Sequence, residues 1–161
     1  MISTPLLETH RQEGAIFGAH QGRRMPRRYS SVSTEYSTVT QGAALLDRSR
    51  VGQLRVWGKD ALDLLDRLST NALMELKLGE STPTVLTSNK GRIIDLLLVA
   101  HMDNHILLLT SPQCCSTVAQ WIDTYTFIED VQVEDVTDTM AMLGVTGPNA
   151  CDVLEKALGE E

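Results

Sequence analysis

The sequence has few cysteines and no long apolar run. The longest uninterrupted apolar stretch, residues 96–100, is far shorter than the roughly 20 residues of a membrane-spanning helix. Residues 1–14 lack the basic start and apolar segment of a signal peptide. The cysteines number 3, and an odd number, two of them adjacent, cannot form a closed set of disulfides. We therefore expect reduced thiols and a cytoplasmic protein without a membrane anchor.

Several well-known chemical signatures are also missing. The sequence contains no phosphate-binding P-loop, no dinucleotide fingerprint and no G-x-S-x-G context for a serine nucleophile. The histidines show no metal-ligand spacing, and adjacent cysteines cannot easily bind one ion together, so no metal site is predicted. The formal net charge of −7 argues against non-specific nucleic-acid binding.

Four arginines nevertheless cluster between residues 23 and 28, around a proline. A polyanionic tail, RNA or an acidic partner protein could meet them. We favour the simpler interpretation that they belong to a solvated loop.

The middle of the chain has a regular pattern. Alternating and helical apolar spacings predict a strand, a helix, three strands, a helix and a strand, at residues 54–57, 59–69, 84–87, 92–101, 106–109, 112–125 and 131–136. This order is typical of an α+β split βαβ (ferredoxin-like) two-layer sandwich with one extra strand.

The flanking segments read as parts of another domain. We expect short helices at residues 4–13 and 36–46, then a strand at 140–145 and a helix at 149–158. They lack partners within the middle unit. The predicted organisation is therefore a partial first domain formed by residues 1–51 and 139–161, with residues 52–138 inserted as a second domain.

Five segments, in order, resemble one protein family. They are Thr4-Pro5-Leu6, then Met25-Pro26 with Tyr29-Ser30-Ser31, then the G-A-A-L-L-D-x-S segment at 42–49, the strand–turn–strand at 86–95, and L-G-V-T-G-P-N-A at 143–150. Together they are similar to the first half of the glycine cleavage T-protein (aminomethyltransferase) and of its YgfZ-type folate-binding relatives. The resemblance implies the T-protein (folate-binding) fold, with tetrahydrofolate as ligand.

The resemblance also implies site residues and partners. The folate-contacting positions would be Val51, Thr87, Asp95, Leu96 and Leu109. The remaining polar anchors of the family pocket lie beyond what these 161 residues contain, so the folate site would be incomplete. Implied partners are folate, a lipoyl carrier protein and iron–sulfur proteins, with homo-oligomer formation through uncovered surface.

The chain departs from the family at the residue expected to be catalytic. The family has a pair of aspartates in an I-I-D-D-L turn and uses the second, whereas this chain reads Ile94-Asp95-Leu96. Successive strand residues face opposite sides, so Asp95 cannot replace its neighbour without a register shift. Leucine can neither ionise nor accept a hydrogen bond.

Three functional hypotheses follow. The first is a tetrahydrofolate-binding, T-protein-like protein without full transferase activity, of the kind tied to iron–sulfur cluster maintenance. The second is an active aminomethyltransferase, with Asp95 as its candidate carboxylate. The third is a protein-interaction module that binds no folate, which an exposed apolar patch would favour. Asp95 has a structural alternative too, as a strand-end residue that binds local amides.

Overall fold

The computed structural model describes residues 2–159, and contacts divide the chain into two compact units. The first unit joins residues 1–50 to residues 141–161, and the second comprises residues 51–140. The predicted domain boundaries fall close to these limits, and the assignment of the units to T-protein domains stays a prediction. Within the described residues, no helix is long and apolar enough to cross a membrane.

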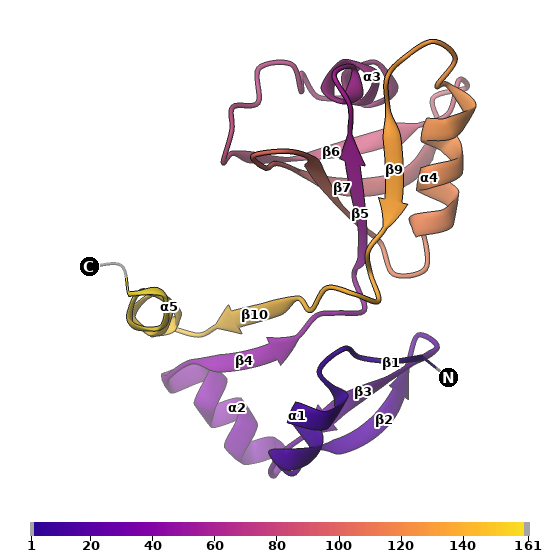
Figure 1. Cartoon of the computed structure of the whole chain (residues 1–161). Helices are drawn as coiled ribbons and strands as arrows, with labels where there is room; N and C mark the ends of the chain where they lie inside the picture. The colour runs from indigo at the N-terminus through magenta and orange to yellow at the C-terminus, as the bar shows by residue number, and fades with distance from the viewer. Residues whose placement is uncertain (1, 160–161) are drawn as a thin grey trace. The chain divides into compact units, whose positions relative to one another are not determined.

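The second unit is built on one five-stranded antiparallel sheet (Figure 1). Its spatial order is β6-β7-β8-β5-β9. The strands are β5 (Gly52–Trp57), β6 (Ser81–Thr87), β7 (Ile93–His101), β8 (Ile106–Thr110) and β9 (Gln132–Asp135), and the helices are α3 (Ala61–Leu68) and α4 (Cys115–Thr124). These elements confirm the predicted sequence of strands and helices in the middle of the chain.

One face of this sheet forms the core with the two helices. Leu64 and Leu65 of α3 and Val118 and Ile122 of α4 are buried in a single apolar cluster. Every second residue of the central strands joins them, namely Leu54, Val56, Leu97, Val99, Ile106 and Leu108. Because side chains alternate across a strand, the residues between these must project from the other face, which we call the open face.

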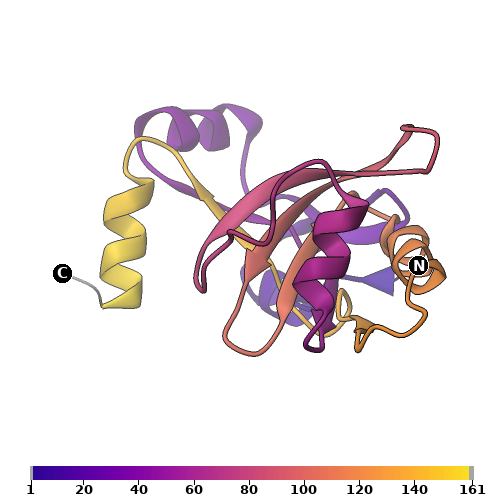
Figure 2. The same cartoon turned by 90° about the horizontal axis from the view of Figure 1, so that it is seen from above.

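The first unit contains two small sheets (Figures 1 and 2). One has the order β1-β3-β2 and the other pairs β10 with β4. The elements are β1 (Ile2–Ser3), α1 (Leu7–Gln12), β2 (Ile16–His20), β3 (Arg23–Arg28), α2 (Val32–Gln41), β4 (Ala44–Asp47), β10 (Leu143–Thr146) and α5 (Ala150–Leu158). The late strand β10 therefore finds its partner in the first fifty residues.

The prediction that the arginine cluster lies in a loop was wrong. These arginines form strand β3, which pairs with β2 across a tight turn at Gln21 and Gly22, both at positive φ. Pro26 is tolerated because β1 pairs only with Arg23 and Arg24, so the proline's missing N–H faces no partner strand there. The turn lacks the usual Asn-Gly signal, which explains why sequence inspection missed it.

The predicted helix at residues 36–46 was misplaced. Helix α2 begins four residues earlier, because the Ser31 side chain caps it by accepting a hydrogen bond from the Thr34 amide at 3.1 Å. Gly42 ends the helix, and Leu45 and Leu46 then belong to strand β4. Strand β4 exists because β10 pairs with it from a hundred residues away, which no local pattern reveals.

Candidate functional site

Strand β7 separates the two residues on which the functional hypotheses depend. Its burial alternates: Asp95, Leu97 and Val99 face the helices, whereas Leu96 and Leu98 project from the open face. Leu96 is 61% exposed, and Asp95 is only 5% exposed. The aspartate and its neighbouring leucine therefore point to opposite sides of the sheet.

Both carboxylate oxygens of Asp95 are engaged by backbone amides. One oxygen accepts from the Leu96 amide at 2.9 Å, and the other accepts from the Ser111 amide, also at 2.9 Å. Ser111 directly follows β8, so this carboxylate ties the end of β8 to β7. The geometry supports the structural interpretation of Asp95. Neither of its carboxylate oxygens is directed toward the open face.

The other predicted site residues lie in rows on the open face. Leu109 of β8 is directly opposite Leu98 of β7 and Gln53 of β5, and opposed residues share a face. Leu96 lies one step further along β7, opposite Val85 of β6. Leu96 and Leu109 are therefore diagonal neighbours on one apolar surface.

Val51 and Thr87 lie at the margins of this surface. Val51 directly precedes β5 and is half-buried, two residues before Gln53. Thr87 ends β6, where the register shifts so that it pairs with Ile93, and it too is half-buried. The structure thus places Leu96 and Leu109 on the open face, with Val51 and Thr87 at its edge. Asp95 alone lies on the helix-covered side.

A polar row follows the leucines on the open face. Arg55 of β5 is opposite Leu107 of β8 on one side and Glu134 of β9 on the other. Its guanidinium lies over the ring of Trp57, 5.4 Å from the ring centroid. The sequence analysis did not single out Arg55, although an arginine between buried Leu54 and Val56 is a recognisable signal of an open-face position.

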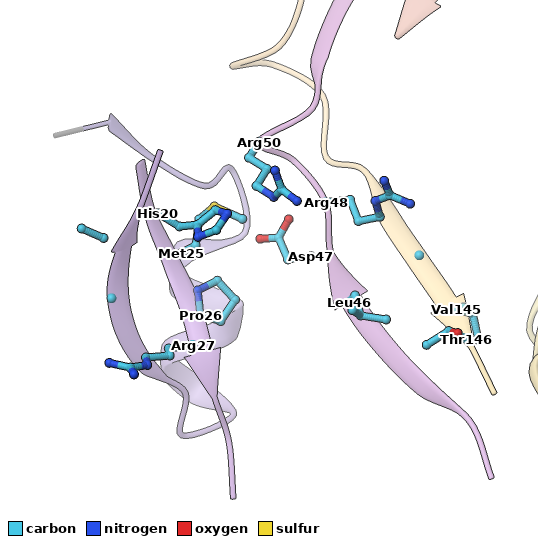
Figure 3. Close-up of a pocket in the computed structure, with 13 residues that line it drawn as sticks. His20, Met25, Pro26, Arg27, Leu46, Asp47, Arg48, Arg50, Val145 and Thr146 are labelled. Carbon is cyan, nitrogen blue, oxygen red and sulfur yellow. The ribbon is translucent and has the colours of Figure 1, made fainter. Parts of the chain in front are cut away.

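The first unit contains a separate hollow of about 910 Å³ (Figure 3). Strands β2 and β3 line it on one side and β4 and β10 on the other. Asp47 and Arg50 lie at its centre in Figure 3, and Arg50 donates a hydrogen bond to the Gln21 side chain at 2.7 Å. None of the predicted folate-contacting residues belongs to this hollow.

Asp47 connects several parts of the first unit. Its carboxylate accepts hydrogen bonds from the Thr4 hydroxyl at 2.5 Å and from the Ser49 amide at 2.8 Å. It also pairs with Nε2 of His10 at 2.7 Å, and Nδ1 of His10 contacts the Tyr29 hydroxyl at 2.5 Å. Burial alone would raise the pKa of Asp47, but the hydrogen bonds from Ser49, Thr4 and His10 outweigh it and lower the pKa.

The cysteines and acidic groups give little sign of metal or thiol chemistry. Within residues 2–159, no group of three or more potential ligands could hold a metal ion. Burial, and then the negative charge of Asp95, raise the pKa of the Cys114 thiol, so it is less reactive than an ordinary cysteine. Cys115 is buried and lies 3.4 Å from the hydroxyls of Thr110 and Thr137.

Comparisons with known proteins give the family. The model of the GCVT N-terminal domain matches residues 6–161. The chain belongs to the GCVT N-terminal domain family. This finding confirms the resemblance to the first half of the T-protein, which was inferred from the five sequence segments.

Individual relatives agree with this assignment. The aminomethyltransferase of Caldanaerobacter subterraneus is 32% identical over 159 residues, which cover 98% of this chain and 42% of that protein. The aminomethyltransferase of Phocaeicola vulgatus is 31% identical over 157 residues, covering 97% of this chain and 43% of the relative. The chain therefore spans less than half the length of these relatives.

A solved structure shows the same fold. The crystal structure of glycine cleavage system aminomethyltransferase T from Bartonella henselae superposes with a TM-score of 0.80 at 27% identity. The match covers 96% of this chain and 43% of that one. This GCVT N-terminal domain is thus a mixed α/β structure similar to an aminomethyltransferase.

Proposed function

We propose that this GCVT N-terminal domain contributes the open face of its second unit to a tetrahydrofolate site, without supplying the acid for aminomethyl transfer. The single observation that carries this proposal is the exposure of Leu96 on the open face while Asp95 points into the core. Leu96, Leu98 and Leu109 form an apolar surface on one face of the sheet, which suits a pterin ring.

The strand order of the second unit supports the same proposal. Strand β5 lies between β8 and β9, and β7 lies beyond β8, with antiparallel pairing throughout. This is the order expected for a split βαβ (ferredoxin-like) sandwich, with β6 as the additional edge strand. In this arrangement both helices cover one face, and on the other face Leu96 and Leu98 are 61% and 37% exposed.

The chemistry argues against full transferase activity. Aminomethyl transfer to tetrahydrofolate needs a carboxylate beside the folate nitrogens, where it can hydrogen-bond or take up charge. Leu96 offers no such group, and the oxygens of Asp95 are occupied by two amides on the far side of the sheet. Turning Asp95 toward the open face would break both hydrogen bonds and slip the register of β7.

A transferase assay tests this directly. The chain is incubated with tetrahydrofolate and an aminomethyl-loaded lipoyl carrier protein, and ammonia release is measured. We expect no release above the blank, in the wild type and in Asp95→Asn alike. Ammonia release by the wild type that disappears in Asp95→Asn, but survives Leu96→Ala, would identify an active aminomethyltransferase instead.

A second candidate, an interaction module, is favoured by the uncovered surface of the first unit. Leu45 and Leu46 are adjacent in β4 and therefore point to opposite faces, yet they are 62% and 45% exposed. Leu143 of β10 is 48% exposed, and α5 buries none of its residues. Apolar surface of this kind is typical of a binding interface.

The implied partners and location stay part of the proposal. A lipoyl carrier protein, iron–sulfur proteins and a cytoplasmic setting rest on the resemblance and on the cysteine pattern alone.

A further inference from the structure

The open face also carries a positively charged side chain, Arg55, which has no part in the apolar surface formed by the leucines. Arg55 is half-buried, and its Nε atom is buried without a hydrogen-bond partner among residues 2–159. A buried guanidinium normally has its donors paired, because leaving them unpaired is costly. The side chain as a whole is only half-buried, and no hydrogen bond or ion pair of its guanidinium occurs among residues 2–159, so its accessible part remains for a ligand.

The neighbouring acid does not neutralise this cation. Glu134 is directly opposite Arg55 on β9, but no ion pair joins them in the described part of the chain. The guanidinium instead lies over Trp57. A guanidinium over an indole face is attracted by the ring's electrons, and this contact does not use the N–H donors of the guanidinium.

The local electrostatics agree with an uncompensated positive charge. His105 is the last residue of the turn between β7 and β8, close to this end of the open face. Burial lowers the pKa of His105, and the positive charge of Arg55 lowers it further. The positive charge of Arg55 therefore acts on a neighbouring group near this end of the sheet.

The spacing of residues along the strands sets the distance between the acidic group and the ring of a ligand. Rows on one face of a sheet follow each other about every 7 Å along the strands. Arg55 lies one row beyond Leu109, and Trp57 lies two rows beyond it. A carboxylate at the guanidinium would therefore be about 7 to 14 Å from a ring resting on Leu98 and Leu109.

We infer that Arg55, held over the ring of Trp57, is a carboxylate-binding residue of the open face, and that it binds the acidic end of a flat aromatic ligand whose ring lies on the leucines. The identification of that ring as a folate rests on the proposed function, whereas the carboxylate site rests on Arg55 itself. Planar guanidinium donors match a carboxylate in a bidentate geometry, which distinguishes this class of ligand from a neutral one.

Three small probes separate these two claims. The first is p-aminobenzoylglutamate, which has the ring and the carboxylates; the second is p-aminobenzamide, which has no carboxylate; the third is 6-methyltetrahydropterin, which has only the pterin ring. Each is titrated at millimolar concentration into the full chain, and backbone amide and tryptophan indole signals are followed by NMR.

The expected result is specific to one probe and one residue. We expect p-aminobenzoylglutamate to shift the signals of Arg55, Leu107 and the Trp57 indole, with binding about tenfold weaker in Arg55→Leu. Arg55→Lys should bind at an intermediate strength, because a lysine keeps the charge but loses the planar fork. We expect p-aminobenzamide to show no dependence on residue 55.

Matched variants exclude a general charge effect. Arg92→Leu removes an exposed cation near the β6–β7 turn and should leave binding unchanged. Glu134→Gln removes the opposed acid and should leave binding unchanged or stronger. Equal affinity of the wild type and Arg55→Leu for p-aminobenzoylglutamate would overturn the inference. So would equal affinity of the wild type for this probe and for p-aminobenzamide, even if Arg55→Leu fails to fold.

The probes also distinguish failure of the inference from failure of the proposed function. If 6-methyltetrahydropterin shifts the Leu96 and Leu109 signals while Arg55→Leu has no effect on p-aminobenzoylglutamate, the folate proposal stands and the role of Arg55 is wrong. If p-aminobenzoylglutamate depends on Arg55 and the pterin binds nowhere on the open face, the carboxylate site stands and the folate proposal is wrong.

Discussion

At the scale of single residues, Asp95 should matter for the stability of the fold, whereas Leu96 should matter for ligand binding. Asp95→Asn places an amide NH₂ against a backbone N–H, so a buried donor loses its acceptor. We expect a loss of about 1–3 kcal/mol in the free energy of unfolding, measured by urea denaturation. Leu96→Ala should change it by less than about 0.5 kcal/mol, because the side chain is mostly exposed.

An unchanged unfolding free energy in Asp95→Asn would contradict this account, since it would mean that the two amide hydrogen bonds contribute nothing. The Leu96→Ala variant serves as the control on the adjacent residue. Its side chain leaves the same strand on the other face.

Asp47 gives a prediction on pH. Its pKa is lowered in the folded chain, so its contribution to stability is present above the ordinary carboxyl pKa near 4 and is lost as the pH falls through the lower, folded value. We expect the wild type to lose more stability than Asp47→Asn between pH 6 and pH 3, as measured by urea denaturation. Parallel acid dependence of the two proteins would show that the contacts of Asp47 with Thr4, His10 and Ser49 do not depend on its charge.

At the scale of elements, the start of α2 is testable because the Ser31 side chain caps it. Ser31→Ala should weaken the helix by about 1 kcal/mol, which corresponds to about fivefold faster exchange of its amide hydrogens if the helix opens locally. Ser37→Ala, at an exposed position within the helix, should leave exchange unchanged or slower. Equal effects of both variants would show that the cap does not determine where α2 begins.

The elements also show what the sequence could and could not predict. The second unit was predictable because its strands alternate cleanly and α3 carries a strong apolar stripe, so each local pattern agrees with the fold. Strands β2, β3 and β4 were missed, since their residues are polar, proline-containing or exposed; β2 and β3 meet across a turn without the usual signal, and β4 is a strand through its pairing with distant β10. Local pattern carries little information where burial is low.

The candidate site was likewise predictable where a local pattern decides and unpredictable where the tertiary fold decides. Alternation in β7 was enough to predict that Asp95 and Leu96 face opposite sides. The amide partners of Asp95 were not predictable, because Ser111 reaches it from another strand through the tertiary fold. Arg55 was missed because its importance depends on the unpaired Nε atom and on Trp57, and a sequence shows neither burial nor pairing.

At the scale of the whole molecule, the first unit should associate with a second copy of the chain. The two-stranded sheet of β4 and β10 exposes apolar side chains on both faces, and so small a sheet is marginal on its own. We expect a concentration-dependent dimer by sedimentation equilibrium, weakened in Leu45→Ser. Lys90→Ser, in the exposed turn of the other unit, is the control. A monomer at all concentrations would contradict this expectation.

The central claim concerns the open face of the second unit as a folate-facing surface that lacks a catalytic acid. The most direct measurement is an NMR titration of the full chain with 5-formyltetrahydrofolate. The account predicts weak, millimolar-range binding, because one face of a sheet covers only one side of a ring, with shifts centred on Leu96, Leu98 and Leu109. Shifts confined to the helix-covered face around Asp95, or no shifts at any folate concentration, would contradict it.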